Sequence, residues 1–195
     1  RVYTADGHSV EVDGNTFVMP ASHVYVNGYF RNIMDGEDFF HYDDSVPEAS
    51  VHTGNRPFHW GIVIPSEDIA MMGYETLSYV GFYYNKNCPG AYEIKVLIDD
   101  EVIFDQTIDM DGESGWFYVY LDEPVALTGD EDVSILLYTE DLATPAVFAD
   151  DYGIDNAGLI WYEDVGDFVN ARYLGLPLTW MIGAGFEWEI PGYTV

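Results

Sequence analysis

The sequence is poor in positive charge and in cysteine, and it has no long apolar run. Only 6 of its 195 residues are Lys or Arg, against 35 Asp and Glu, so the formal net charge is −29. Such a surface repels nucleic acid and anionic lipid, which excludes both as partners. The single Cys88 excludes an internal disulfide framework, and it has no zinc-ligand spacing around it. No apolar run approaches the roughly 20 residues that a membrane-spanning helix needs, which excludes direct membrane insertion by a helix.

Apolar and aromatic residues are plentiful despite the charge. The chain is 48% hydrophobic and 16% aromatic, enough apolar surface to offset the entropy of ordering the backbone. We therefore expect a folded domain with an acidic coat. Its plausible partners are neutral glycans, Ca²⁺, basic patches on a host or neighbouring surface protein, and neighbouring domains of the same polypeptide.

Side-chain polarity alternates with a period of two along most of the chain. Turn residues such as Gly, Pro, Asp and Asn separate the alternating runs every 8–12 residues or so, and no long segment has a helical pattern. The pattern predicts an all-β fold, an antiparallel β-sandwich of the jelly-roll type. The predicted strands are 16–19, 24–30, 60–64, 79–84, 92–98, 102–105, 116–121, 133–138, 159–162 and 180–188.

A domain boundary is expected near residue 32. The segment from Gly14 to Phe30 contains Phe17-Val18-Met19-Pro20-Ala21-Ser22-His23-Val24-Tyr25-Val26. This run resembles the closing half of the β-grasp-like repeats of bacterial surface proteins, of the divergent internalin B-repeat type. We therefore assign residues 1–31 to a partial β-grasp-type repeat and expect it to form a short β-hairpin-like remnant. Residues 32–190 form the β-sandwich module, and 191–195 a linker or the start of another repeat.

The larger part of the chain resembles the jelly-roll modules of secreted peptidases, lipoproteins and adhesins of bacteria, the group that includes cleaved-adhesin and carbohydrate-binding-like domains. The resemblance is carried by motifs in a fixed order. They are His41-Tyr42-Asp43-Asp44, the strand from Trp60 to Pro65, Leu77 to Tyr84, Tyr92 to Val96, Gly115 to Leu121 with Pro124-Val125, and Trp180 to Ala184. Members of this group do not share one activity. The resemblance implies an accessory module of a secreted or cell-surface multidomain protein, located outside a bacterial cell.

One strand carries the first candidate ligand site. In the run from Trp116 to Leu121, alternation places Phe117, Val119 and Leu121 on one face of the strand, which we assign to the core. The other face carries three large aromatic residues, which either form an exposed platform for a glycan or pack beneath another part of the protein. Tyr79 and Tyr83 could extend that surface. The predicted glycan-binding residues are Trp116, Tyr118, Tyr120 and Tyr83.

Acidic loops carry the second candidate site. Calcium takes six to eight oxygen ligands, which clustered carboxylates can supply. The predicted structural Ca²⁺ ligands are Asp43 or Asp44 together with Asp150 or Asp151. With 35 carboxylates in the chain, chance clusters are also expected, and these carboxylates are then simply solvated charge.

Signs of catalysis are weak. His52 and His59 flank a turn and could approach each other, but no HExxH, GxSxG or Ser-His-Asp signature accompanies them. We expect no enzymatic activity and assign no catalytic residue. The favoured function is a non-catalytic adhesion or carbohydrate-binding module. The alternatives are a structural spacer or self-assembling surface-filament subunit, joined through terminal strands, and, less favoured, a glycan-active enzyme domain.

Overall fold

The structure is a computed structural model, which describes residues 2–4, 12–13, 16–18, 24–26, 37–150, 154–162 and 166–187. Every strand pair among them is antiparallel. In the first part of the chain, β1 (Val2–Thr4) pairs with β4 (Val24–Val26), and β2 (Val12–Asp13) pairs with β3 (Thr16–Phe17). No helix in the described ranges is long and apolar enough to cross a membrane.

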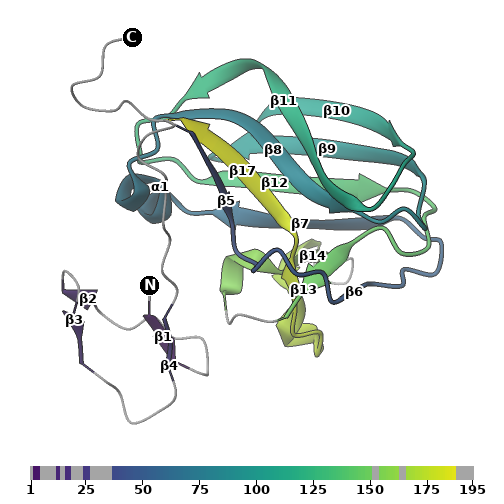
Figure 1. Cartoon of the computed structure of the whole chain (residues 1–195), viewed down its shortest axis with the longest axis horizontal. Helices are drawn as coiled ribbons and strands as arrows, with labels where there is room; N and C mark the ends of the chain where they lie inside the picture. Colours follow the sequence, from purple (N-terminus) through teal and green to yellow (C-terminus); the bar gives the residue numbers. More distant parts are fainter. Residues whose placement is uncertain are drawn as a thin grey trace.

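Two sheets form the body of the protein and lie one over the other (Figure 1). The larger sheet has the strand order β10-β9-β12-β7-β14-β15. It contains β7 (Phe58–Ile64), β9 (Gly90–Ile98), β10 (Glu101–Met110), β12 (Val133–Thr139), β14 (Leu159–Tyr162) and β15 (Asp167–Asn170). The smaller sheet has the order β11-β8-β17-β5. It contains β5 (Glu37–His41), β8 (Thr76–Tyr84), β11 (Gly115–Ala126) and β17 (Ile182–Glu187).

Shorter elements complete the fold. A small sheet has the order β16-β13-β6, from β6 (Ala49–Ser50), β13 (Val147–Ala149) and β16 (Thr179–Trp180). Two 3₁₀ turns, η1 (Asp155–Ala157) and η2 (Ala171–Leu174), precede β14 and follow β15. One α-helix, α1 (Ser66–Met72), lies at one end of the sandwich (Figure 1).

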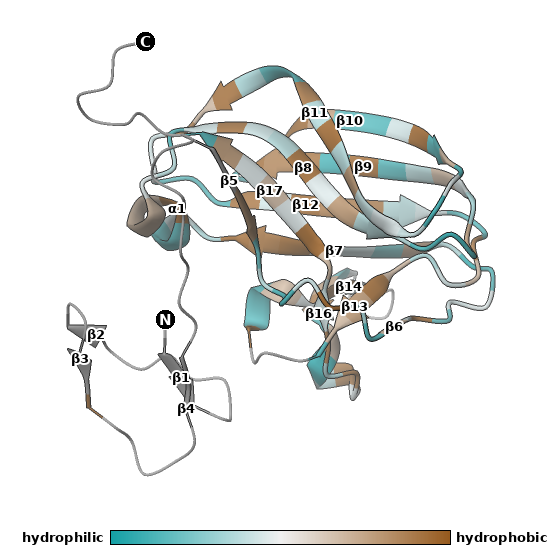
Figure 2. Cartoon of the chain, in the orientation of Figure 1, coloured by the Kyte–Doolittle hydropathy of each residue, from teal (hydrophilic) through white to brown (hydrophobic). Residues whose placement is uncertain are grey.

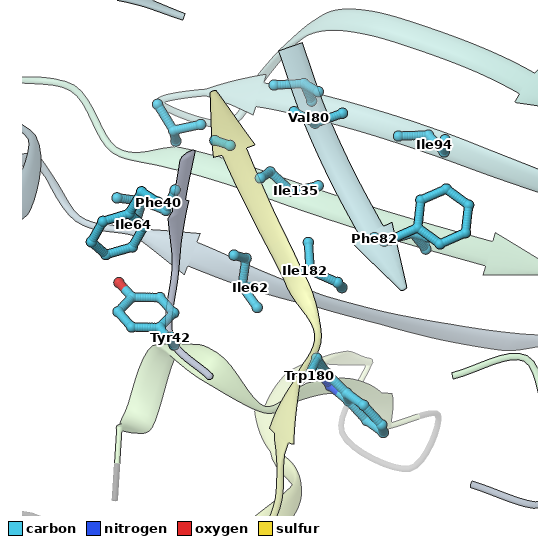
Figure 3. Packing of buried hydrophobic residues seen from close by; sticks show 14 of the residues in the cluster. Phe40, Tyr42, Ile62, Ile64, Val80, Phe82, Ile94, Ile135, Trp180 and Ile182 are labelled. Carbon is cyan, nitrogen blue, oxygen red and sulfur yellow. The ribbon is translucent and has the colours of Figure 1, made fainter. Parts of the chain in front are cut away.

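The core lies between the two main sheets and follows from the alternation along the strands. In β12, Val133, Ile135 and Leu137 are buried, while Ser134 and Leu136 between them are partly exposed. Figure 2 shows the same alternation of apolar and polar residues along the central strands. Figure 3 shows side chains from both sheets meeting in one cluster, among them Ile62, Ile64, Ile94 and Ile135 of the larger sheet and Phe40, Val80, Phe82 and Ile182 of the smaller.

The predicted all-β antiparallel sandwich is confirmed. The jelly-roll type stays a prediction, with which the two strand orders are consistent. Several elements were not predicted, namely the strands β1, β2, β5, β6, β13 and β15 and the helix α1. Strand β5 was missed because its sequence, Glu37 to His41, does not alternate clearly. Helix α1 is short and follows Pro65, its first turn is acidic, and Gly73 ends it in the left-handed conformation at φ 64°.

The turn between β8 and β9 encloses the only cysteine. Cys88 is 3% exposed, and its Sγ accepts a hydrogen bond from the backbone N–H of Thr144 at 3.3 Å. The backbone oxygen of Cys88 accepts a hydrogen bond from the hydroxyl of Tyr92 at 3.0 Å. These contacts tie the turn to the loop before β13, so Cys88 is a packing residue in this structure.

Candidate ligand-binding face

The outer face of the four-stranded sheet is covered by aromatic rings. The alternation predicted for β11 is observed, with Val119 and Leu121 buried and the intervening tyrosines exposed. Strand β8 pairs with β11, so that Tyr83 lies beside Trp116. We call this surface the aromatic face; its residues are Phe39 and His41 of β5, Tyr79 and Tyr83 of β8, and Trp116, Tyr118 and Tyr120 of β11.

Bare backbone in the middle of this sheet lets the rings lie close to it. A Cβ atom placed on Gly81 would be 2.9 Å from Phe39 Cζ and 2.9 Å from Tyr118 Cδ1, closer than real contacts allow. A Cβ atom on Gly185 would overlap the ring of Tyr79. The strand register pairs Gly81 of β8 directly with Gly183 of β17. The glycines beneath the aromatic face are Gly81, Gly183 and Gly185.

The rings contact one another in a continuous network centred on Phe39. Its ring is stacked on Tyr79 at 6.0 Å between centroids. It meets Trp116 edge-on at 5.0 Å and Tyr118 edge-on at 5.2 Å. Tyr120 continues the network through Tyr79, at 5.1 Å. Such pairs stabilise one another by about 0.5–1.5 kcal/mol each beyond their buried area, so the face is pre-organised.

The predicted residues divide into two kinds. Trp116 and Tyr83 are partly buried and pack against a small apolar cluster formed by Val147, Ala149 and Met181. Tyr118 and Tyr120 are 43% and 69% exposed, so their rings are available to a ligand. Partial burial, and then the neighbouring Tyr120, raise the pKa of the Tyr118 hydroxyl, which therefore stays protonated at neutral pH and can donate a hydrogen bond. On this outward face, Trp116 is therefore partly packed, whereas Tyr118 and Tyr120 are exposed; glycan binding by them stays a prediction.

His41 of the aromatic face is paired with Asp43, and sequence reasoning did not predict the two together. His41 lies 5.4 Å from Trp116 between ring centroids, and its Nδ1 is 3.2 Å from Asp43 Oδ1. The Asp43 side chain is fully buried; its Oδ1 accepts the Ser45 backbone N–H at 2.7 Å. Within the described part of the chain, the other carboxylate oxygen of Asp43 has no hydrogen-bond partner. A spacing of two residues along one strand end is the sequence signal for this pair.

The predicted calcium ligands are placed only in part. Asp44 is exposed, and its carboxylate accepts the Val46 backbone N–H at 2.9 Å. Asp150 is exposed directly after β13, which pairs with β6 and so brings the two segments into one small sheet. Asp151 lies outside the described residues. Among those that are described, no group of three or more His, Cys, Asp or Glu side chains is arranged to hold a metal ion.

The two histidines that flank the predicted turn have different surroundings. His52 is exposed and accepts the Gly54 backbone N–H on its Nδ1 at 3.0 Å. His59 lies in β7 and stacks on Tyr138, with 4.3 Å between ring centroids. The other residue of the aromatic face that sequence reasoning missed is Phe39, which the pairing of β5, β17 and β8 brings beside Tyr79.

The aromatic face offers flat apolar rings and tyrosine hydroxyls at an open sheet surface. Rings of this kind can stack on the C–H face of a flat ligand while hydroxyls at their edges exchange hydrogen bonds with it. No protein-family model matches the chain, and neither does any curated protein.

Proposed function

We propose that this protein is a non-catalytic adhesion or carbohydrate-binding module, carried by a secreted or cell-surface multidomain bacterial protein. The single observation that supports this proposal is the aromatic face, which exposes Tyr118 and Tyr120 above a stripe of glycines on the four-stranded sheet. The binding residues in this proposal are those two tyrosines with Trp116 and Tyr83.

The shape and the exposure of the aromatic face favour an extended, flat partner. Tyr120 is 69% exposed, although aromatic side chains of this size are usually buried to a large extent. Contiguous exposed apolar surface of this kind is typical of interaction sites. Phe39 and Tyr79 hold the rings in place, so binding costs little conformational entropy.

Charge narrows the class of partner. The chain carries a formal charge of −29, which opposes the approach of polyanionic polysaccharides. The aromatic face itself contains His41 but neither Lys nor Arg. A neutral polysaccharide, whose sugar rings present apolar faces and hydroxyl edges, matches this surface best.

Co-sedimentation of the whole chain with insoluble neutral polysaccharides tests the proposal. Tyr120→Ala and Tyr118→Ala should each reduce the bound fraction several-fold. Tyr173→Ala is the matched control, because Tyr173 is 73% exposed but belongs to η2, outside the aromatic face. Retained binding in both aromatic-face variants, or equal loss in the control, would refute the proposal.

A structural spacer or self-assembling filament subunit is the second candidate. It is favoured by the edge strands of the two main sheets, which among the described residues are β5 and β11 in the smaller sheet and β10 and β15 in the larger. Edge strands carry unpaired backbone groups that can pair with another chain. Light scattering separates the candidates: a monomer that binds polysaccharide supports the module, and concentration-dependent polymers without polysaccharide binding support the filament.

Structural calcium remains part of the proposal. It is supported by Asp43, which buries one carboxylate oxygen without a hydrogen-bond partner among the described residues, and by the exposed carboxylates of Asp44 and Asp150. A bound Ca²⁺ would neutralise such an oxygen and tie the loop after β5 to the end of β13.

A further inference from the structure

A groove lies in the outer face of the six-stranded sheet, on the opposite side of the sandwich from the aromatic face. Its volume is about 350 Å³, at the lower end of the ~300–1,000 Å³ typical of small-molecule sites. Five strands contribute to it. The side chains that line it and carry the argument are His59, Glu93, Lys95, Tyr138, Trp161 and Phe168.

Strand register brings these side chains together. Tyr138 of β12 is paired with His59 of β7 on one side and with Glu93 of β9 on the other, so the three share one outward row. In the next row, Leu136 lies over Gly61; a Cβ atom on Gly61 would be 2.7 Å from Leu136 Cδ2. Because Gly61 has no side chain, Leu136 can lie low, and the sheet surface is hollowed there.

Aromatic rings form one wall of the groove. Trp161 is 40% exposed and meets Phe168 edge-on, with 5.4 Å between ring centroids. On the neighbouring strands His59 stacks on Tyr138, and the tilted Trp161 ring lies 6.4 Å from His59. This wall presents apolar ring surface to whatever occupies the groove.

Charged groups form the other wall, and they compensate one another. Lys95 Nζ donates to Glu93 and lies 3.6 Å from Asp105. The hydrogen bond to Glu93 is the main cause that raises the pKa of Lys95, which therefore stays charged. Burial lowers the pKa of His59, while Glu93 raises it and Lys95 lowers it, so that the imidazole is neutral at pH 7. The wall thus offers donors and acceptors but no free positive charge.

We propose that this groove binds one or two rings of a neutral sugar, as a second site independent of the aromatic face. One face of the sugar ring would stack on Trp161. Neighbouring hydroxyls would donate to the Glu93 carboxylate and accept from the Lys95 ammonium, both of which remain partly exposed at 27% and 39%. This inference goes beyond the proposed function, because it concerns the other main sheet and a short, soluble sugar instead of an extended polysaccharide.

Other ligand classes fit the groove less well. An anion is repelled by the net charge of −29, and the lysine that could bind it, Lys95, is already shared by two carboxylates. A cation meets a Glu93 already paired with Lys95. A purely apolar ligand would remove water from both charged groups without replacing their hydrogen bonds, which is costly. A ring with vicinal hydroxyls replaces them.

Calorimetric titration of the whole chain with cellobiose, xylobiose, lactose and mannobiose tests the inference. Trp161→Ala and Glu93→Gln should each weaken binding at least tenfold. Glu113→Gln is the matched control for the second variant, because Glu113 also pairs with a lysine, Lys86, at 2.8 Å, but lies outside the groove. Tyr120→Ala, on the aromatic face, should leave binding of these disaccharides within twofold.

The outcomes separate the two sites. If no neutral disaccharide binds, or if Glu93→Gln binds as the unchanged protein does, the groove is not a sugar site. Loss of disaccharide binding in Tyr120→Ala overturns the inference in favour of the aromatic face. Should Trp161→Ala fail to fold, Glu93→Gln and its control decide the matter alone. If the Tyr120→Ala variant no longer binds the insoluble polysaccharide but still binds the disaccharides, both sites are supported.

Discussion

A methyl group placed beneath the aromatic face is the sharpest test of its architecture. Gly81→Ala puts a Cβ atom 2.9 Å from both Phe39 Cζ and Tyr118 Cδ1. Carbon atoms in contact prefer about 3.5–4.0 Å, so both rings must move outward by about half an ångström or more. The substitution therefore changes the flatness of the face without removing any exposed side chain.

The expected cost follows from two opposing terms. Overpacking typically costs about 1–3 kcal/mol, and replacing Gly by Ala in a strand interior returns roughly 0.5–1 kcal/mol. We expect a net loss of about 0.5–2 kcal/mol in the free energy of unfolding. The displaced atoms are ring ends, which can shift, so the fold should survive.

Gly115→Ala provides the control within the same sheet. A Cβ atom on Gly115 would have no heavy atom within 4 Å, and its φ is not positive, so this variant should be neutral or more stable by up to ~1 kcal/mol. Urea unfolding gives the stabilities, near-ultraviolet circular dichroism reports the ring packing, and co-sedimentation with polysaccharide gives the binding. If Gly81→Ala matched Gly115→Ala in all three, the rings would not lie over bare backbone and the reasoning would fail.

Three further predictions concern stability. Trp116→Ala should lower the free energy of unfolding by about 2–3 kcal/mol, less than the ~3–5 kcal/mol expected for a fully buried Trp, whereas Tyr120→Ala should lower it by less than about 1 kcal/mol. Equal losses of stability in urea unfolding would contradict the division of the face into packed and exposed residues. Burial lowers the pKa of His59 below its unfolded value of 6.5, so the contribution of His59 to stability is present above pH 6.5 and is lost as the pH falls below that value. Between pH 7.5 and 5.5 the unchanged protein should therefore lose more free energy of unfolding than the His59→Phe variant. Parallel plots of stability against pH for the two proteins would refute this. The calcium proposal predicts that EDTA lowers the melting temperature and that Asp150→Asn removes the effect; identical melts with and without EDTA would exclude it.

Local alternation along the strands made part of the fold predictable. In β11, the sequence alone separated the buried Val119 and Leu121 from the outward Tyr118 and Tyr120, because a period of two assigns each residue to one face. Which neighbours share that face depends on strand order and register. Phe39 reaches Tyr118 only because β17, with its glycines, lies between β5 and β8.

The groove on the six-stranded sheet could not be predicted from local sequence patterns. His59 and Trp161 are far apart in the sequence, and each is an isolated residue in its own strand pattern. Pairing of β7 with β14 places them on neighbouring strands, and the pairing of β9 with β12 adds Glu93 and Lys95. Nothing in the local pattern of any one strand indicates a hollow, because the hollow depends on a glycine in β7 and a leucine in β12.

The single buried thiol has a practical consequence. Cys88 is the only cysteine of the chain and is 3% exposed in the turn between β8 and β9. A thiol reagent can modify it only when that turn separates from Thr144 or when the whole domain unfolds. The rate of modification, followed as a function of denaturant, therefore measures opening at one defined place without any engineered label. Ligand that binds the aromatic face, which shares β8 with this turn, should slow that reaction if the strand and its turn open together.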